Sequence, residues 1–487
     1  MRNKHLKILH IGNIANNAYN NAKILNKLNF KNDVLSADYF HIMGCPEWEE
    51  LDIQPSQLND FNPEWYRVNK DFDRPVWFVQ GNFIDCLHYL IAKNKGFTKE
   101  QKKYWNFLKY QNKTQKKNFK YYLIWIDLKL IRGIIRRISR FFNFNHQERY
   151  NSYLKIAEKV IQDYNLKFPD RSDKLTLEDV LSNQPHILLL DLLKSYDLIF
   201  CYGASTILPA SLGFKDYVGF EHGTLRDIPW LQTSSGRLTA LSYSISKSIL
   251  MTNADSVSQA QLLNQRIHFG QHGFIIEDSQ KKILKYSQKS ILNDYLKLSL
   301  RRRFKILQPT RQDWKTKGND KFLRALSQMK RKGFDNFDVL LVSWGEDIDV
   351  ANEFIKEHHL DSHIFWIPTL SKPQLLKLYT EVDLLVDQFN IPCIGSTPLE
   401  IFSVKGAPLI TSLDDNMMKT FYGRTIPLLN CHNIDDIYQM LEKIFLEEID
   451  LSKVREDCYQ WLIETHSEEK IVSTLLESQG FFSARAI

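Results

Sequence analysis

Short apolar runs recur along the chain, and each is followed by a stretch with helical spacing. At the N-terminus, LKILHIG has the pattern of a buried strand, and the Asn-rich stretch after it places Ala18, Ala22, Leu25 and Leu28 on one helical face. Later runs with a strand pattern are DVLSADYF, PVWFVQG, YDLIFCYG, YVGFEHG and SILMTNADSV. Strands and helices that alternate in this way predict an α/β domain built on a parallel sheet.

A second series of the same kind begins after the basic LSLRRR. Its strand-like runs are FKILQPTR, DVLLVSWG, HIFWIPT, DLLVDQF and APLITS. The simplest arrangement is two Rossmann-like domains facing a cleft. We predict an N-terminal domain over 1–278 with an insertion at about 100–180, a linker over 279–303 and a C-terminal domain over 304–450. A helical segment over 451–487 follows, and packing back on the N-terminal domain is one option for it.

Composition narrows the class of protein. The 487 residues are 43% hydrophobic and 25% charged, which is typical of a globular protein with two or three domains. The six cysteines are scattered without a CxxC pair or a metal-ligand spacing, so we expect no metal site. The start of the chain lacks the apolar core of a signal peptide, and no run of about 18 apolar residues predicts a spanning helix. These features favour a location in the reducing cytoplasm.

The positive charge is concentrated in one segment. The chain has a net charge of +7, yet residues 101–150 hold thirteen Lys and Arg against two acidic residues, so the rest is slightly acidic. Within 119–142, apolar residues have helical spacing and a separate cationic stripe accompanies them. The cations of interest are Lys129, Arg132, Arg136, Arg137 and Arg140. A cationic amphipathic helix fits an anionic membrane surface. A helix packed on its own domain remains open, and we expect no nucleic acid partner.

Arg311 and Lys317 lie where one strand passes into a helix, in QPTRQDWKTKGND. In an open α/β sheet, ligands bind in the crevice beyond the carboxyl ends of the strands. Two cations at such a position predict an anionic ligand.

A helix start with exposed amides is predicted in GSTPLE. Gly395 lies in a loop, Ser396 and Thr397 follow, and we expect Thr397 to be the N-cap and Pro398 the first helical residue. The free N–H groups of such a turn bind anions. Glu400 has two interpretations, a capping box with Thr397 or a ligand of a ribose diol.

Two polar positions in the N-terminal half are further candidates. The turn after the first strand lacks GxGxxG, which counts against a nicotinamide or flavin enzyme, and Asn13 there is either a ligand contact or an ordinary turn residue. His222, in YVGFEHGTLRDIPW, ends a strand on the opposite side of the crevice. It is either a polar cap or an active-site residue.

Several of these motifs together resemble a known family. TRQDWKTKGND, the WIP at 366–368 with the helix after it, and GSTPLEIFSVKGAPLIT look like the donor-binding half of retaining glycosyltransferases of the GT-B fold, family 4 type. Residues 304 to about 412 carry the resemblance.

The resemblance implies roles for the candidate residues. Arg311 and Lys317 would contact the diphosphate of a sugar nucleotide together with the amides near Ser396 and Thr397, and Glu400 would bind the ribose. Ile367 and Pro368 would contact the base, and His222 the donor sugar. The family's motif also has a glutamate eight positions before Glu400, where this chain has Pro392. The residue that does its work here is therefore open, with Asp387 or Gln388 as candidates.

These observations predict a glycosyltransferase of the hexosyltransferase class that moves a sugar from a nucleoside diphosphate sugar with retention of configuration and needs no metal or other cofactor. The expected acceptor is a glycan or a lipid-linked glycan in bacterial surface polysaccharide synthesis, and the expected location is the inner face of the cell membrane. The alternatives are another GT-B enzyme, such as a nucleotide-sugar epimerase or a phosphorylase, and a non-catalytic protein that binds membrane or nucleic acid.

Overall fold

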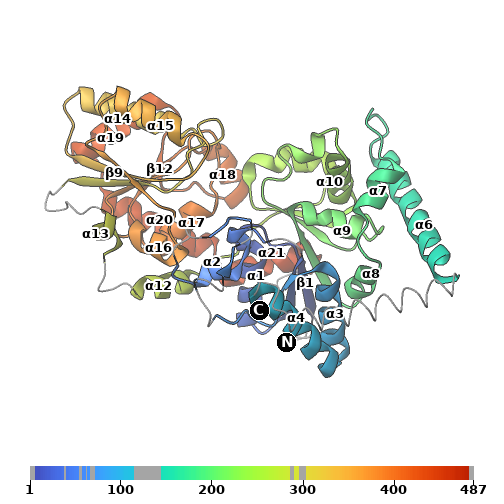
Figure 1. Cartoon of the computed structure of the whole chain (residues 1–487). Coiled ribbons are helices and arrows are strands. Elements are labelled where there is room, and N and C mark those ends of the chain that lie inside the picture. The colour runs from blue at the N-terminus through green and yellow to red at the C-terminus, as the bar shows by residue number, and fades with distance from the viewer. Residues whose placement is uncertain are drawn as a thin grey trace.

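Two α/β domains lie side by side in the computed structural model (Figure 1). The structure describes residues 6–37, 40–53, 58–61, 63–65, 68, 72–113, 144–285, 290–295 and 303–481. The cationic stripe predicted at Lys129, Arg132, Arg136, Arg137 and Arg140 lies outside these residues.

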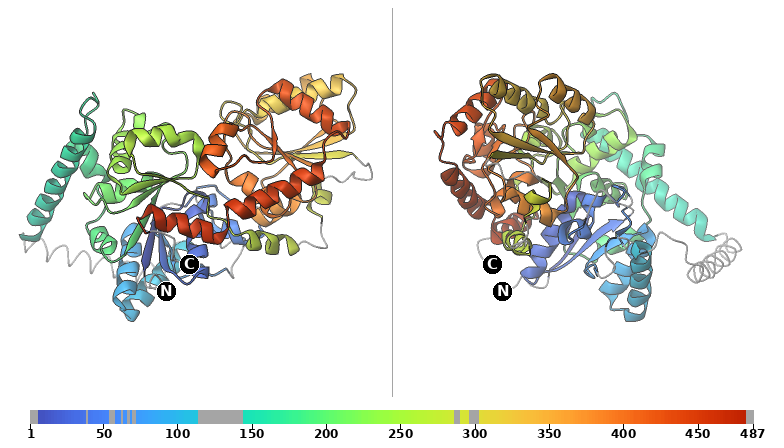
Figure 2. Two further views of the ribbon diagram at one scale, coloured as in Figure 1. Left: turned by 180° about the vertical axis from the view of Figure 1, so that it is seen from behind. Right: turned by 60° about the vertical axis from the view of Figure 1, so that its left-hand side comes forward.

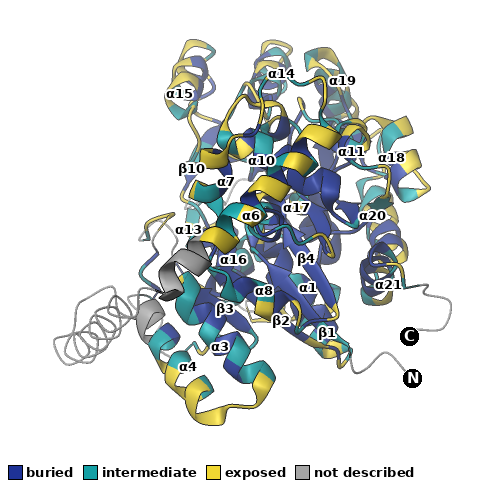
Figure 3. Ribbon diagram, turned by 90° about the vertical axis from the view of Figure 1, so that its right-hand side faces the viewer, coloured by how far each residue is buried: buried dark blue, intermediate teal, exposed yellow. Residues whose placement is uncertain are grey.

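The N-terminal domain contains a seven-stranded parallel sheet in the order β3-β2-β1-β4-β5-β6-β7. Its strands are β1 (Lys7–Ile11), β2 (Lys31–Ala37), β3 (Phe78–Gly81), β4 (Leu198–Tyr202), β5 (Val218–Glu221), β6 (Ser248–Met251) and β7 (Ile267–Phe269). The central strands are apolar and buried because helices cover both faces of the sheet (Figure 3). The strand order reverses between β1 and β4, which marks the switch point of this sheet.

Helices of very different length connect these strands. They are α1 (Asn17–Lys27), α2 (Pro46–Glu50), α3 (Phe83–Lys95), α4 (Thr98–Lys113), α6 (Phe144–Lys167), α7 (Leu177–Asn183), α8 (Leu188–Leu193), α9 (Ile207–Ala210), α10 (Ser234–Ile245) and α11 (Val257–Leu263). Short 3-10 turns are η2 (Ile14–Asn16), η3 (Ile42–Gly44), η6 (Gly203–Thr206), η7 (Ile228–Trp230) and η8 (Ala254–Ser256). The turn after β1 needs Gly12, which has φ of 84° and lies so close to Ser205 that a Cβ would overlap its side chain.

The C-terminal domain repeats the plan with a six-stranded parallel sheet in the order β10-β9-β8-β11-β12-β13. Its strands are β8 (Phe304–Gln308), β9 (Phe337–Val342), β10 (Ile364–Ile367), β11 (Leu384–Val386), β12 (Leu409–Thr411) and β13 (Leu429–Asn430). Its helices are α14 (Asn319–Arg331), α15 (Ile348–Glu357), α16 (Lys372–Tyr379), α17 (Ser396–Ser403), α18 (Asp415–Tyr422) and α19 (Ile434–Phe445). The switch point lies between β8 and β11.

The chain passes between the domains twice. The first crossing includes α12 (Ile276–Leu284) and α13 (Ile291–Tyr295), so α12 runs across residue 278, where the predicted N-terminal domain ends. The second consists of α20 (Leu451–Thr465) and α21 (Glu468–Ser478), which run from the C-terminal domain to the N-terminal sheet (Figure 2). Ile471, Leu475 and Leu476 of α21 are buried in the same apolar cluster as strands β1, β4 and β5. Gln479 Nε2 donates to the Ile199 carbonyl of β4 at 2.8 Å.

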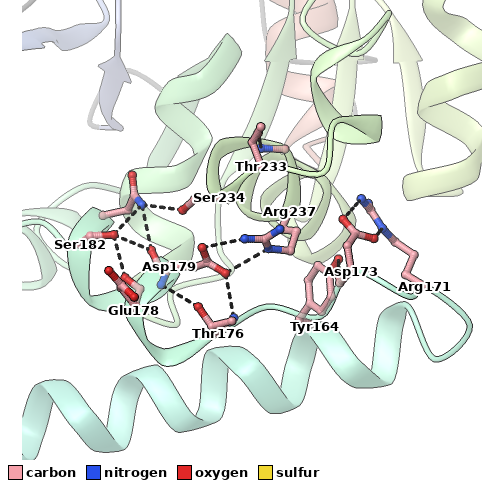
Figure 4. Close-up of polar contacts among 12 residues, drawn as sticks. Tyr164, Arg171, Asp173, Thr176, Glu178, Asp179, Ser182, Thr233, Ser234 and Arg237 are labelled. Atoms are coloured by element: carbon pink, nitrogen blue, oxygen red, sulfur yellow. Dashed lines mark hydrogen bonds and ion pairs between the residues drawn. The ribbon is translucent and has the colours of Figure 1, made fainter.

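A polar network ties the outlying α6 and α7 to α10 (Figure 4). Arg237 of α10 donates to both oxygens of Asp179, at 3.0 and 2.8 Å, while Asp179 also completes a capping box with Thr176. Arg171 forms a second bidentate pair with Asp173 and donates to the Pro229 carbonyl at 2.9 Å. These contacts hold the second half of the predicted insertion, at 144–180, against the N-terminal domain.

The predicted fold class of two Rossmann-like α/β domains is confirmed. All six cysteines are buried and free. In the part of the chain that the structure describes, no helix combines the length and the apolarity needed to span a membrane.

Candidate functional site

The carboxyl ends of both sheets meet at the boundary between the domains. Arg226 follows β5 and pairs with Asp255, which follows β6, at 2.6 and 3.0 Å. From the other domain, the Cys393 thiol donates to Asp255 Oδ1 at 3.3 Å. The crevice predicted beyond the strand ends is therefore formed by residues of both domains.

Lys317 carries a partly buried ammonium group at the switch point of the C-terminal sheet. Its Nζ donates to Gln388 Oε1 at 2.6 Å, and no carboxylate among the described residues lies within ion-pairing distance of it. The turn is held by backbone bonds from Lys317 N to Asp313 O and from Phe389 N to Lys317 O, each 2.7 Å. Burial lowers the pKa of Lys317; the charge of Asp387 opposes this effect, and the charges of Arg311 and Arg226 add to it.

Asp387 is the acidic member of this cluster. It follows β11, is buried, and its Oδ1 accepts a 2.5 Å hydrogen bond from the Thr310 hydroxyl after β8. Burial raises the pKa of Asp387, and the nearby Lys317 charge only partly offsets that. The cluster thus joins the two strands that flank the switch point.

Arg311 lies in the same turn but is more exposed. Its side chain is 47% exposed and pairs with Asp313 at 2.9 Å. Arg226, Arg311 and Lys317 together bring three cations to the crevice, and the contribution of Arg226 was not anticipated from the sequence. The sequence feature that could have identified Arg226 is its position shortly after the β5 strand, where His222 also lies.

The helix start in GSTPLE differs from the prediction. The N-cap of α17 is Gly395 and the helix begins at Ser396, so Thr397 is not the N-cap and Pro398 is not the first helical residue. Pro398 is tolerated within the first turn because the first N–H groups of a helix have no intrahelical partner. Ser396 is exposed toward the crevice and Thr397 is half-buried.

Glu400 does not form the predicted capping box. There is no capping box at α17, and the buried Glu400 carboxylate instead accepts a hydrogen bond from Lys372 Nζ, on the first residue of α16. Burial raises the pKa of Glu400, while Lys372 lowers it. The capping-box interpretation is wrong; the ribose interpretation remains a proposal.

His222 ends β5 inside a group of aromatic rings. It stacks on Tyr202 with centroids 5.6 Å apart and faces His272 at 6.3 Å. Burial lowers the pKa of His222 well below its ordinary value, so the ring is neutral. Its neighbour Glu221 accepts backbone hydrogen bonds from Gly223 and Leu225, and burial raises the pKa of this carboxyl to about 7.

Three remaining candidates occupy different environments. Asn13 is buried and fully hydrogen-bonded, because its Nδ2 donates to Asn16 Oδ1 and to Gly44 O and its Oδ1 accepts from Tyr19 N. Ile367 is 1% exposed at the end of β10, and Pro368 after it is exposed.

A pocket opens between the domains. It encloses about 570 Å³ of empty space, part of it open to solvent. Its lining includes Asn17, Glu49 and His272 from the N-terminal domain, Lys282 of α12, and Lys372, Ser396 and Glu400 from the C-terminal domain. Nothing in the sequence pattern singles out Glu49, Lys282 or Lys372, since each lies on a helix with an ordinary charged pattern. Among the described residues, no group of three or more His, Cys, Asp or Glu side chains could hold a metal ion.

Comparisons with known proteins find similar structures but no similar sequence. No protein-family model and no curated protein matches the chain. Solved structures with a related fold include Anabaena HepE in complex with UDP and glucose, with 15% identity, 66% of this chain and 95% of that chain covered, and a TM-score of 0.47. A UDP-forming α,α-trehalose-phosphate synthase from Burkholderia xenovorans has 12% identity, coverages of 62% and 77%, and the same TM-score. Sucrose-phosphate synthase from Thermosynechococcus elongatus has 13% identity, coverages of 60% and 76%, and a TM-score of 0.43.

Proposed function

We propose that this protein is a glycosyltransferase that takes its sugar from a nucleoside diphosphate sugar. The observation that supports this most is Lys317, a partly buried ammonium whose direct partner is a neutral amide and which lies at a switch point, where the charges of Arg311 and Arg226 also act on it. A buried cation is stabilised by an anion. A diphosphate suits the site because it has several charged oxygens that separate cations can contact at once.

The chemistry needs no protein nucleophile in this proposal. When the bond between the sugar and the diphosphate breaks, negative charge accumulates on the departing phosphate oxygen. Lys317, Arg311 and the exposed amides at the start of α17 are fixed before the reaction and stabilise that charge. Glu400 binds the ribose, Ile367 and Pro368 border the base, and neutral His222 contacts the donor sugar.

The finer assignments rest on the sequence resemblance. They are retention of configuration, no need for a metal, and a glycan or lipid-linked acceptor in bacterial surface polysaccharide synthesis. We assign the role of the family's first glutamate, which Pro392 replaces, to Asp387, because Asp387 follows β11 at the switch point and its charge acts on Lys317. An epimerase or a phosphorylase on the same fold would use the same site but form a different product, an epimer or a sugar phosphate.

A thermal-shift panel tests nucleotide binding. We expect one of UDP, GDP and ADP to raise the melting temperature, because a ligand that binds only the folded state stabilises it by RT ln(1 + [L]/Kd), about 2.7 kcal/mol at a hundredfold excess over Kd. UDP, which is bound in the Anabaena HepE structure, is the first of the three to test. A protein unaffected by all three at millimolar concentration would not have this function.

Attachment to a membrane surface is a separate part of the proposal and depends on residues 119–142. Each basic side chain near an anionic surface contributes about 1 kcal/mol. Replacing Arg132, Arg136, Arg137 and Arg140 with Gln should release the protein from anionic vesicles in a sedimentation assay. A control with Lys332, Lys356, Lys419 and Lys453 replaced by Gln makes the same charge change at exposed positions of the C-terminal half. Sedimentation that is equal for the two variants contradicts a membrane role for the segment.

A further inference from the structure

Four charged side chains from both domains surround the interdomain pocket. Glu49 belongs to α2, Lys282 to α12, Lys372 to α16 and Glu400 to α17. Glu49 Oε2 lies 3.8 Å from Lys282 Nζ, and Lys372 is paired with Glu400. Next to them, Ser371 Oγ hydrogen-bonds to Asp52 Oδ1 at 3.3 Å, which keeps the segment after α2 against the start of α16.

Lys372 lies between two carboxylates, of which it contacts one. Its side chain is 13% exposed and that of Glu400 is 8% exposed, so this ion pair is largely removed from water. Glu49 is not in ion-pairing contact with Lys372, but its charge acts on both members of the pair, stabilising the Lys372 ammonium and opposing ionisation of Glu400. Lys372 and Glu49 line the same pocket, and a lysine ammonium sits on a flexible four-carbon stem that can change its partner.

We propose that Lys372 is a positioning residue that pairs with Glu400 as seen here and moves to Glu49 when the ribose diol of a nucleotide binds Glu400. This relay rests on the proposed function, because it needs a ribose in the pocket. The relay explains why Glu400, the proposed ribose ligand, is paired with Lys372. It also means that Glu49, on the opposite domain, contributes to nucleotide affinity.

The physical reason for the relay is the cost of an unpaired buried charge. A ribose diol that hydrogen-bonds both oxygens of the Glu400 carboxylate takes the place of Lys372 at Oε1 and leaves the Lys372 ammonium without that partner inside the protein. Removing one member of a buried ion pair is strongly destabilising unless another group compensates the charge left behind. Glu49 can do so because its present contact with Lys282 is long, at 3.8 Å. Nucleotide binding then creates a Glu49–Lys372 pair between the domains.

A double-mutant cycle on nucleotide affinity tests the relay. UDP, GDP and ADP are titrated calorimetrically into the wild-type protein, Glu49→Gln, Lys372→Met and the double variant. We expect Glu49→Gln to weaken binding about tenfold when Lys372 is present, and no more than about twofold in the Lys372→Met background, because only a displaced lysine needs Glu49. Glu49→Ala serves as a second neutral variant if the Gln variant folds poorly.

Glu50→Gln is the matched control. Glu50 lies on the same helix α2, but its Oε1 accepts from Lys23 at 2.7 Å and from the Tyr19 hydroxyl at 3.0 Å and does not line the pocket. Its substitution makes the same charge change and should leave affinity within about twofold of wild type. The relay is overturned, while the proposed function stands, if Glu49→Gln binds nucleotide as tightly as wild type does. It is also overturned if Glu49→Gln weakens nucleotide binding equally in the wild-type and Lys372→Met backgrounds. If none of the three nucleotides binds the wild-type protein, both are overturned.

Discussion

Lys317 is proposed to bind a ligand although its surroundings in the protein disfavour its positive charge. Its ammonium is partly buried and feels the charges of two arginines, and its hydrogen-bond partner is the Gln388 amide rather than a carboxylate. Asp387 lies near enough to favour the charged form but is held by Thr310. In the proposed function an anion from outside completes this position, and the diphosphate of the sugar nucleotide is that anion.

Replacing Lys317 with methionine tests this role, because methionine keeps an unbranched apolar side chain and removes the charge. We expect the Kd for the nucleoside diphosphate to rise about 10- to 150-fold, which corresponds to the loss of one charged hydrogen bond worth roughly 1.5–3 kcal/mol. Lys315→Met in the same loop is the control, since Lys315 is exposed. Calorimetry that finds equal losses for the two variants would place the diphosphate elsewhere.

The residues of the candidate site differ in how far the sequence could place them. Arg311 and Lys317 were recognised because local order, a strand followed by a polar turn and a helix, determines where they lie. The predictions of Thr397 as the N-cap and of a capping box with Glu400 were wrong, because α17 starts earlier in the chain than expected. The true partner of Glu400, Lys372, is 28 residues earlier in the chain, and its choice depends on how α16 and α17 pack.

At the scale of elements, apolar runs located the buried strands, including the three-residue β11 and β12, but not β7 and β13. The β8 and β9 runs were visible because strands of a parallel sheet are buried on both faces and read as continuous apolar stretches. The β7 strand at the edge of its sheet has three residues, none of them buried, and β13 has two. Strands this short and this exposed leave no hydrophobic pattern to detect.

The Asp179–Arg237 pair gives a prediction for the α7–α10 contact. Burial opposes ionisation of Asp179, but hydrogen bonds from Arg237 and Thr176 outweigh it and lower its pKa to about 2. A lowered carboxyl pKa stabilises the fold above the ordinary pKa of 3.8, and that stabilisation is lost as pH falls toward 2. Asp179→Asn should therefore lower the free energy of unfolding by about 2 kcal/mol at pH 7.

Urea unfolding between pH 7 and pH 3 measures this effect. The difference between wild type and Asp179→Asn should begin to shrink below about pH 4, as the wild-type carboxylate starts to protonate. Asp170→Asn, on an exposed residue nearby, should change stability by less than about 0.5 kcal/mol. A stability difference that does not depend on pH would mean that the ion pair contributes little.

At the scale of the whole molecule, the two domains are joined by more than a linker. The chain crosses through α12 and returns through α20 and α21, whose apolar face is buried on the N-terminal sheet. Arg226, Asp255 and Cys393 connect the domains at the strand ends, and the pocket beside them has walls from both. Two alternating series of strands and helices predicted the two domains, whereas these contacts depend on residues hundreds of positions apart and left no local pattern.

Sugar transfer by the assembled molecule tests the central claim most directly. The nucleotide that binds in the panel is supplied as its sugar conjugates together with saccharide and lipid-linked acceptors, and mass spectrometry follows both products. We predict that nucleoside diphosphate is released in step with the gain of one glycosyl unit by an acceptor, and that Lys317→Met slows both by at least about tenfold. The account would be contradicted if the sugar nucleotide binds but is recovered unchanged, or if it is converted to an epimer or to a sugar phosphate.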